Sequence, residues 1–403
     1  MSRNYNSAPR RGNNSRRSFG GSRRKGPAKQ FIHPSKFIKA AKAVDVVAYE
    51  PKHTFGDFAL NDLLKANLEK KKFTVPSAIQ DQSIPHGLEG RDVIGIANTG
   101  TGKTAAFALP VIHKLMSDPN SKALIMAPTR ELAQQIENDC RSFASKSGLT
   151  GALLIGGSSM GKQLKDLRMN PNIIIGTPGR IKDHYERGTL PLGKCNIVVL
   201  DEVDRMVDMG FINDIRYLLG ETNPDRQSFF YSATLDNKIN QLIQTFLKDP
   251  ITISVKTGDT GENIEQNVVR YSANNEKIEK LHDVLNSDIV EKTLVFDETQ
   301  RSVERLSKEL QDRGFSADAI HGGKSQGARS RALKRFRNNE VKVLVATDVA
   351  ARGIDISDIS HVINYSTPNA YEDYVHRIGR AGRAGRTGYA LTFISGGGSA
   401  NRY

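Results

Sequence analysis

The 403-residue chain contains no tryptophan and only two cysteines, Cys140 and Cys195. Neither cysteine belongs to a CxxC or metal-ligand pattern, so we interpret them as buried free thiols rather than as a redox pair. The sequence also has no apolar run of about eighteen residues and no hydrophobic N-terminal signal. These absences argue against a disulfide scaffold and a membrane-spanning protein, and we expect a cytoplasmic protein.

Acidic residues are absent from residues 1–44, which carry twelve Lys and Arg residues. The whole chain has 58 basic and 44 acidic residues. The part outside residues 1–44 therefore has 46 basic and 44 acidic residues and is nearly neutral. The stretch to about Gln30 is rich in Arg, Ser, Asn and Gly and cannot bury a core, so we predict that residues 1–44 form a largely disordered basic tail. It is either a solubilising tail or an arm that binds phosphate backbones nonspecifically. Its last part, residues 31–44, regains apolar spacing, which indicates a short helix or a docking segment.

Short Val-, Ile- and Leu-rich runs alternate with helical patterns from about Thr54 onward, as in βα units. Nearly continuous apolar runs of this kind are typical of parallel strands buried on both faces. We expect strands at Asp92–Ala97, Ala123–Pro128, Ala152–Gly156, Asn172–Thr177, Ile197–Asp201, Gln227–Ala233, Val268–Tyr271, Thr293–Asp297, Ala317–His321, Lys342–Thr347, His361–Tyr365 and Tyr389–Ile394. The sequence therefore predicts an α/β fold with one domain at 45–255, a glycine-interrupted linker at 256–264 and a second domain at 265–403.

A glycine-rich sequence, Ala97-Asn98-Thr99-Gly100-Thr101-Gly102-Lys103-Thr104, stands between the first expected strand and a helical pattern at Ala105–Leu115. Such a turn offers backbone N–H groups to phosphate oxygens, while Lys103 neutralises charge and the Thr104 hydroxyl binds Mg²⁺. A chance glycine turn is the alternative. The preceding strand and the Lys-Thr ending favour a nucleotide site.

An acidic sequence, Asp201-Glu202-Val203-Asp204, ends the apolar run at 197–200. Its carboxylates should therefore emerge at the carboxyl edge of a parallel sheet, where ligands of such folds bind. Asp201 can hold Mg²⁺ through water, and Glu202 can orient and deprotonate an attacking water. A solvated acidic turn that caps the next helix is an alternative for Asp204 alone.

With these motifs and the run His376-Arg377-Ile378-Gly379-Arg380-Ala381-Gly382-Arg383, the chain resembles DEAD-box ATP-dependent RNA helicases of superfamily 2 from Phe55 to Ile394. The resemblance implies two tandem RecA-like domains, ATP and Mg²⁺ as cofactors, and RNA as the partner. The acidic motif has Val203 where the family has alanine. We expect this larger side chain to leave hydrolysis intact.

The resemblance also implies roles for residues that the bare sequence would not single out. Gln80 would bind the adenine edge with Phe55 stacked beside it, although alone they would be interpreted as a helix residue and a core aromatic. The remaining nucleotide contacts would come from Thr99, Gly100, Thr101, Gly102, Lys103, Thr104 and, on the ribose, Asp355. Arg380 and Arg383 would bind the γ-phosphate as charge develops. Asp204, Ser232, Thr234 and His376 would couple hydrolysis to strand separation.

RNA contacts implied by the resemblance involve groups suited to phosphates and 2′-hydroxyls rather than to bases. They are Pro128, Thr129, Arg130, Gly156, Gly157, Thr177, Gly179 and Arg180 in the first domain, and Thr299, Gln326, Arg329, Thr347, Arg352 and Gly353 in the second. Two departures from the family pattern, Gln300 and Gly323-Lys324, concern local RNA contacts.

We therefore expect a monomeric ATP-dependent RNA helicase that binds RNA without sequence preference and couples ATP hydrolysis to local unwinding or remodelling. Two alternatives are an ATP-dependent RNA clamp in which Val203 weakens turnover, and a DNA helicase of the same superfamily. Because the chain ends at Tyr403, soon after the last expected strand, we expect no C-terminal recognition domain.

Overall fold

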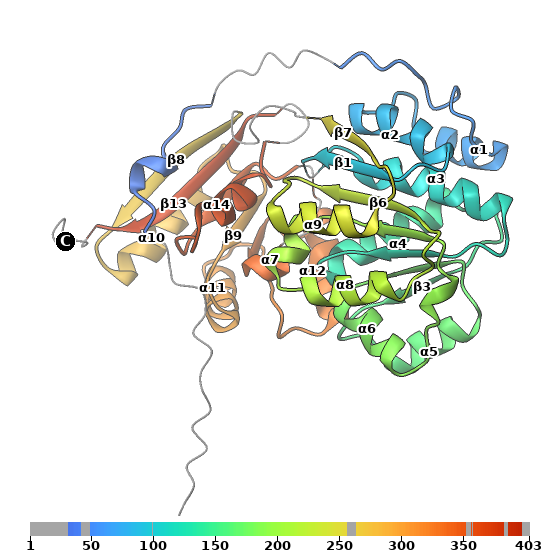
Figure 1. Ribbon diagram of the computed structural model, residues 1–403. Helices are drawn as coiled ribbons and strands as arrows, with labels where there is room; N and C mark the ends of the chain where they lie inside the picture. Colours follow the sequence, from blue (N-terminus) through green and yellow to red (C-terminus); the bar gives the residue numbers. More distant parts are fainter. Residues whose placement is uncertain are drawn as a thin grey trace, which may run out of the picture.

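The computed structural model describes residues 31–41, 49–98, 100–255, 263–351, 356, 358–382 and 386–396. They form two α/β domains with parallel sheets, as the sequence predicts (Figure 1). Among the described helices, none combines the length and hydrophobicity needed to cross a bilayer. Both cysteines are buried free thiols, and burial raises the pKa of Cys195 to about 12.

The first domain contains a seven-stranded sheet in the order β3-β4-β2-β5-β6-β1-β7, and every strand pair in it is parallel. Its strands are β1 (Val93–Ala97), β2 (Ala123–Met126), β3 (Gly151–Leu154), β4 (Ile173–Gly176), β5 (Ile197–Leu200), β6 (Gln227–Ser232) and β7 (Ile251–Val255). Its helices are α1 (Asp62–Lys70), α2 (Ala78–Leu88), α3 (Lys103–Ser117), α4 (Arg130–Phe143), α5 (Met160–Arg168), α6 (Pro178–Glu186), α7 (Val203–Asp208), α8 (Ile212–Gly220) and α9 (Asn237–Phe246).

The second domain contains a six-stranded parallel sheet in the order β10-β11-β9-β12-β13-β8. Its strands are β8 (Ile264–Tyr271), β9 (Thr293–Phe296), β10 (Ala317–Ile320), β11 (Val343–Ala346), β12 (His361–Asn364) and β13 (Gly388–Ser395). Its helices are α10 (Asn274–Leu285), α11 (Gln300–Asp312), α12 (Gln326–Arg337), α13 (Asp348–Ala351) and α14 (Tyr371–Ile378). Strand β8 begins at Ile264, four residues before the expected start and inside the predicted linker.

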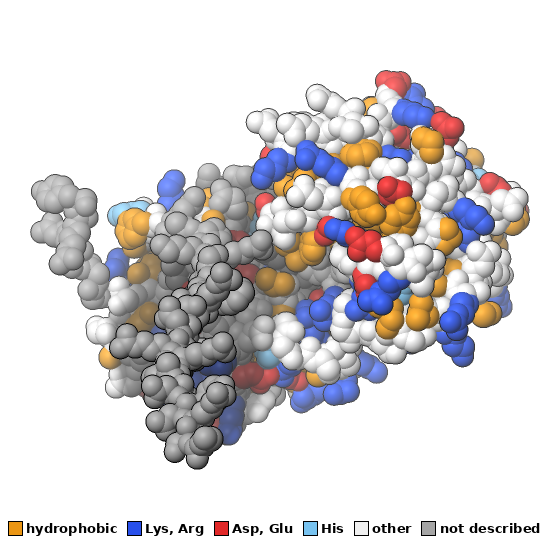
Figure 2. All heavy atoms as spheres, turned by 60° about the horizontal axis from the view of Figure 1, so that its bottom comes forward, with side chains coloured by type: hydrophobic (Ala, Val, Ile, Leu, Met, Phe, Trp, Pro, Cys, Tyr) orange, Lys and Arg blue, Asp and Glu red, His pale blue; other side chains and the backbone are white. Residues whose placement is uncertain are grey.

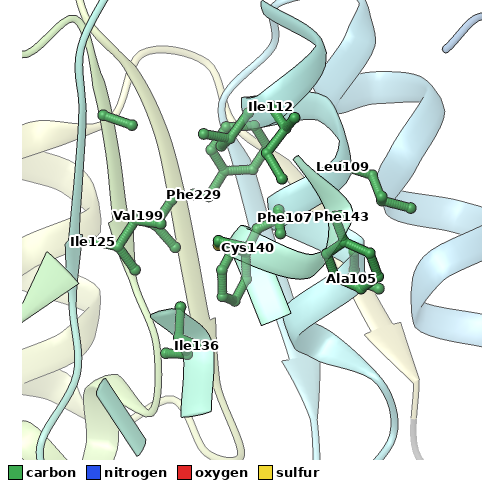
Figure 3. Packing of buried hydrophobic residues seen from close by; sticks show 14 of the residues in the cluster. Ala105, Phe107, Leu109, Ile112, Ile125, Ile136, Cys140, Phe143, Val199 and Phe229 are labelled. Carbon is green, nitrogen blue, oxygen red and sulfur yellow. The ribbon is translucent and has the colours of Figure 1, made fainter. Parts of the chain in front are cut away.

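The core of the first domain lies on both faces of its sheet. On one face, Phe107 of α3 and Cys140 of α4 pack near Phe229 of β6 and Val199 of β5 (Figure 3). On the other face, side chains of α7, α8 and α9 pack on β2, β5 and β6. Each fully buried Phe or Leu contributes roughly 2 kcal/mol of transfer free energy, so a sheet covered on both faces is a rigid base for the loops at its edge.

The last part of the predicted tail contains the short helix that its apolar spacing indicated. Residues 31–41, which we call the docking segment, contain a 3₁₀ helix (η1, Pro34–Phe37) and pack on β8 and β13 of the second domain. Apolar spacing in this stretch did indicate a docking segment, and the buried side chain of Phe37 is the reason for the ordered contact. Residues 1–30, 42–44 and most of the predicted linker lie outside the described residues.

Candidate functional site

The predicted site residues of the first domain follow the carboxyl ends of six neighbouring strands. The loops after β1, β5 and β6, which are adjacent in the sheet, carry the glycine-rich loop, the acidic motif and Ser232. The loops after β3, β4 and β2, adjacent to one another in the other half of the sheet, carry the residues predicted to bind RNA. The sheet order therefore separates the two predicted sets of residues along one edge, and we call the two parts the nucleotide half and the RNA half after those predictions.

The glycine-rich loop turns into α3 at Gly102, whose φ of 89° requires a residue without a side chain. Lys103 is 6% exposed, and its Nζ donates to the carbonyl oxygen of Ala97 at 3.0 Å, across the mouth of the loop. Gln80 Nε2 donates to the Gly102 carbonyl at 3.0 Å, and Ser77 Oγ donates to the Thr101 carbonyl at 2.7 Å. The start of α2 is thus fastened directly to the loop. Thr99 lies outside the described residues.

Phe55 lies in an aromatic cluster of the first domain. Its ring contacts those of Phe58 and Phe73, with centroids 5.9 and 5.5 Å apart, and the residue is buried. This is the core aromatic that the bare sequence indicates. Stacking of Phe55 on adenine remains a prediction.

The acidic motif is buried and its backbone is constrained. Glu202 has a φ of 53°, a left-handed conformation that costs a non-glycine residue roughly 1 kcal/mol or more and is common at functional sites. Burial raises the pKa of Asp201 to about 6, although Lys103 opposes the shift. Burial would also raise the pKa of Glu202, but Arg205, Lys103, Arg380 and His376 lower it below the usual range. Glu202 is therefore kept ionised by cations from both domains.

The donor set at the nucleotide half suits Mg²⁺. A carboxylate at Asp201 and a hydroxyl at Thr104 are hard oxygen ligands, and the buried Asp201 carboxylate lacks a compensating cation within ion-pair distance among the described residues. No group of three or more His, Cys, Asp or Glu residues capable of holding a metal occurs in the described part of the chain. This pattern fits an ion bound through one or two side chains, water and substrate phosphates.

Asp204 contacts both predicted coupling hydroxyls. Its backbone N–H donates to Ser232 Oγ at 3.3 Å, and its Oδ2 accepts from the N–H groups of Ala233 and Thr234 at 3.0 and 3.2 Å. Ser232 Oγ in turn donates to the Thr234 carbonyl at 2.7 Å. The carboxylate that ends the acidic motif and the loop after β6 therefore move as one unit.

The second domain closes over the nucleotide half. A small cavity between the domains is lined by first-domain residues, among them Lys103, Glu202 and Asp204, and by Val375, His376 and Gly379 of the second domain. The neighbouring Arg377 is buried and makes two bonds to Asp348, from Nε at 2.6 Å and from Nη2 at 2.7 Å. Arg377 thus holds α14 to α13, and His376 faces the cleft. Arg383 and Asp355 lie outside the described residues.

At the RNA half of the first domain, guanidinium groups gather beside a glycine turn. Burial lowers the pKa of Arg130, and the charges of Arg329 and Arg180 add to the shift. Gly157 has a φ of 76°, and a side chain there would collide with the Arg130 guanidinium. Thr129 caps α4 by accepting from the Leu132 N–H at 3.3 Å. Pro128 and Gly156 lie in the loops after β2 and β3, and Thr177, Gly179 and Arg180 lie at the start of α6.

The second domain contributes its predicted RNA residues from loops after β9, β10 and β11, which are also neighbours in their sheet. Thr299 caps α11, Gln326 begins α12 and Thr347 follows β11. The Arg329 guanidinium is buried and pairs with Glu131 of the first domain at 2.7 Å, and its contact with RNA remains a prediction. Arg352 and Gly353 lie outside the described residues.

Sequence reasoning placed Glu131 in an RNA-contact motif but did not predict its pairing with the second domain, and it missed Arg205. Arg205 Nε lies 3.4 Å from Glu202 Oε2, and both side chains are buried. Arg205 also lines a second interdomain cavity beside Asp348, Asp373 and Arg377. The sequence signal for Arg205 was its position directly after the acidic motif. Only the structure shows that Arg205 faces the second domain.

The departures from the family pattern have clear structural settings. Val203 is fully buried in the cluster that joins α7 to the sheet, together with Met206 and Phe230. Lys324 Nζ lies 3.2 Å from Glu304 Oε1, which also contacts His321 Nε2 at 2.7 Å. This lysine is therefore held inside its own domain by an acidic neighbour.

Comparison with known proteins covers both domains. The family described as DEAD/DEAH box helicase matches residues 77–242, and the helicase conserved C-terminal domain matches residues 276–385. The ATP-dependent RNA helicase CshA of Listeria monocytogenes is 44% identical over 342 residues, which cover 84% of this chain and 66% of that protein. The DEAD-box ATP-dependent RNA helicase CshA of Bacillus subtilis is 43% identical over 345 residues, or 85% of this chain and 69% of that protein. The chain thus spans about two thirds of the length of these relatives.

Solved structures give a further comparison. Dbp5 of S. cerevisiae bound to RNA and ADP BeF3 is 30% identical and has a TM-score of 0.75, covering 85% of this chain and 89% of that one. A DEAD box protein from Methanococcus jannaschii is 39% identical but has a TM-score of 0.50, covering 85% of this chain and 93% of that one. The solved structure with the higher sequence identity thus has the lower TM-score. This is expected when the two domains of one protein are placed differently relative to each other than those of the other protein.

Proposed function

Because this chain belongs to the DEAD-box family of ATP-dependent RNA helicases, we propose that it hydrolyses ATP between its two domains and uses their closure to distort bound RNA. The cavity that brings Lys103 and Glu202 to His376 and Gly379 is the observation that supports this function most directly. No single domain supplies all four residues. Closure therefore both completes the hydrolytic site and brings the RNA loops of the two sheets together.

The hydrolytic step follows from the charges in this cavity. Lys103 neutralises the phosphates, and Glu202, kept ionised by Arg205 and its other cationic neighbours, orients and deprotonates the attacking water. Arg380 and Arg383 bind the γ-phosphoryl oxygens as negative charge builds. Asp201 and Thr104 would hold Mg²⁺, which would supply further charge neutralisation on the phosphates.

RNA binding in this proposal involves the sugar-phosphate backbone. The Arg130 and Arg180 guanidinium groups and the glycine turn at Gly157 provide contacts without base-specific geometry. Figure 2 shows basic and acidic side chains interspersed on one face of the described residues, in keeping with a nearly neutral core. We therefore propose that the basic tail provides a constant, salt-sensitive attraction to RNA. Domain closure provides the part of the RNA affinity that depends on ATP.

The RNA-clamp alternative requires Val203 to disable turnover. Its side chain lies within a well-packed apolar cluster, and its neighbours Glu202 and Asp204 keep their contacts to Arg205 and to the loop after β6. This arrangement favours an active hydrolase. We also propose that the protein acts as a monomer, because one chain supplies both sides of the cleft, and that it works in the cytoplasm, where two free thiols remain reduced.

The test is the ATPase rate of the full chain with single-stranded RNA, with DNA of the same sequence and without nucleic acid. We expect strong stimulation by RNA only. Equal stimulation by DNA would favour the DNA helicase, and ATP-dependent RNA retention without turnover would favour the clamp. The matched control is Lys103→Ala, which removes the phosphate contact and should abolish all three rates.

A further inference from the structure

The docking segment lies on the second domain although it precedes the first domain in the sequence. Residues 49–98 belong to the first domain, whereas η1 of the docking segment packs on β8 and β13 of the second domain (Figure 1). The segment is therefore held at a distance from the domain to which it is joined covalently.

Phe37 anchors this segment. Its side chain is fully buried in a cluster with Ile264, Tyr374, Ile378 and Ala390, and its ring stands edge-on to that of Tyr374 with centroids 4.7 Å apart. Such aromatic pairs add about 1 kcal/mol beyond the buried area. Phe37 thus fills a site in the core of the second domain rather than resting on its surface.

Backbone pairing fixes the segment beside β8. Lys39 N–H donates to the Gln266 carbonyl at 3.0 Å, and Gln266 N–H donates to the Lys39 carbonyl at 2.8 Å, as in an antiparallel ladder. β8 is the outer strand of its sheet, so the docking segment covers part of an open edge. Tyr374 Oη donates to Gln266 Oε1 at 2.9 Å, which joins the covered strand to α14.

This contact bears on the proposed reaction because α14 carries His376 and ends just before Arg380. Tyr374 and Ile378, which pack against Phe37, lie on the same helix. Tyr374 lies two residues before His376, and Ile378 lies two residues before Arg380. A helix of only eight residues depends on its packing to keep a fixed direction.

The other end of the N-terminal segment is fastened next to Gln80. Asp81 accepts from Tyr49 Oη at 2.6 Å and from the Lys52 N–H at 2.8 Å, and its Oδ1 lies 2.7 Å from His53 Nδ1. Burial would raise the pKa of Asp81, but these three partners lower it below its usual value. Seven residues, 42–48, join the two fastened parts, and they can span at most about 27 Å.

We propose that Phe37 is a positioning residue for α14, and that the docking segment is a second tether which limits the separation of the two domains. The positioning half rests on the proposed function of His376 and Arg380. The tether half rests on contacts alone: Asp81 holds one end to the nucleotide half of the first domain, and Phe37 holds the other end to the helix that faces it.

The positioning test compares Phe37→Ala with Ile38→Ala in the full chain, since Ile38 is adjacent but 53% exposed. Phe37→Ala should speed hydrogen exchange of residues 31–41 by about a hundredfold, which is the effect expected when a large buried aromatic side chain is removed. It should also speed hydrogen exchange of residues 371–378. The kcat of RNA-stimulated ATPase should fall about tenfold, as for displaced catalytic groups, while ATP affinity without RNA stays within about twofold. Ile38→Ala should leave all three readouts unchanged.

Three outcomes would overturn the positioning role. They are unprotected amides at 31–41 in the wild-type chain, an α14 whose exchange is unaffected by Phe37→Ala, and a kcat that stays at the wild-type value after the segment is released. Absence of ATPase from the wild-type chain would instead refute the proposed function, while the exchange of 371–378 would still report whether Phe37 holds α14.

The tether test inserts twenty Gly and Ser residues after Ala41, which raises the maximum span to about 95 Å and leaves Phe37 in place. Fluorescent labels on the two domains should then report a larger mean separation in the ligand-free protein, with an unchanged kcat at saturating ATP and RNA. An unchanged distribution of separations would refute the tether.

Discussion

The ion pair between Glu131 and Arg329 gives the sharpest prediction about closure. The two residues belong to different domains, their side chains are 4% and 5% exposed, and Arg329 Nη2 lies 2.7 Å from Glu131 Oε2. When the domains separate, both groups can be solvated. Loss of one partner should therefore destabilise the closed arrangement and leave the folding of each domain nearly unchanged.

The magnitude follows from burial. Removal of one partner from a buried pair leaves an uncompensated charge, which costs about 3 kcal/mol or more. Since 1.4 kcal/mol is a factor of ten, Arg329→Ala should lower the equilibrium constant between closed and open forms by roughly a hundredfold. The Arg329 Nε and both Glu131 oxygens lack partners with good hydrogen-bond geometry among the described residues, so we expect the lower end of the range for such pairs.

The assay is a double-mutant cycle on closure, measured by fluorescence transfer between the domains at saturating ATP and RNA. We expect Glu131→Ala and Arg329→Ala to be non-additive by at least about 1.5 kcal/mol, and the charge-swapped pair Glu131→Arg with Arg329→Glu to recover part of the loss. Additive losses, combined with a reduced salt dependence of RNA binding in Arg329→Ala alone, would refute this reasoning. Arg329 would then act on a phosphate, as the sequence predicts.

Three further predictions concern single steps. Glu202→Gln should keep ATP and RNA binding but lower the RNA-stimulated kcat by about a hundredfold or more, as measured by steady-state turnover; near wild-type turnover would assign the base elsewhere. Burial lowers the pKa of His361 to about 4, below its unfolded value. The second domain should therefore lose up to about 3 kcal/mol of unfolding free energy as pH falls from 6.5 to 4. Chemical denaturation at several pH values should show this pH dependence, and the His361→Gln variant should lack it. Deletion of residues 1–30, which carry nine basic residues, should weaken RNA binding mainly at low salt and leave maximal ATPase unchanged, whereas deletion of 1–44 removes Phe37 and should lower it.

The sequence was sufficient for the parts of the fold that depend on local pattern. Strands such as Ile197–Leu200 are continuous apolar runs, and the loop that ends in Gly102 and Lys103 combines a strand, a turn and a helix within a few residues. Both features are set by nearest neighbours along the chain. Their positions could therefore be predicted within a few residues.

Contacts between the domains could not be predicted in the same way. The pairing of Arg329 with Glu131 depends on how two separately folded units meet, and no local spacing encodes that meeting. Phe37 is a similar case, because its apolar character indicated docking but its partners lie more than two hundred residues away in the sequence. Even Phe55, whose burial fits a core aromatic, shows that one aromatic pattern is compatible with packing and with ligand stacking.

The division of one sheet edge into a nucleotide half and an RNA half has a thermodynamic consequence. In the proposed function both ligands would contact loops of the same sheet, and closure of the second domain would complete both sites. Each ligand would then act as an effector of the other without any internal signal path between them. By linkage, the factor by which ATP tightens RNA binding must equal the factor by which RNA tightens ATP binding.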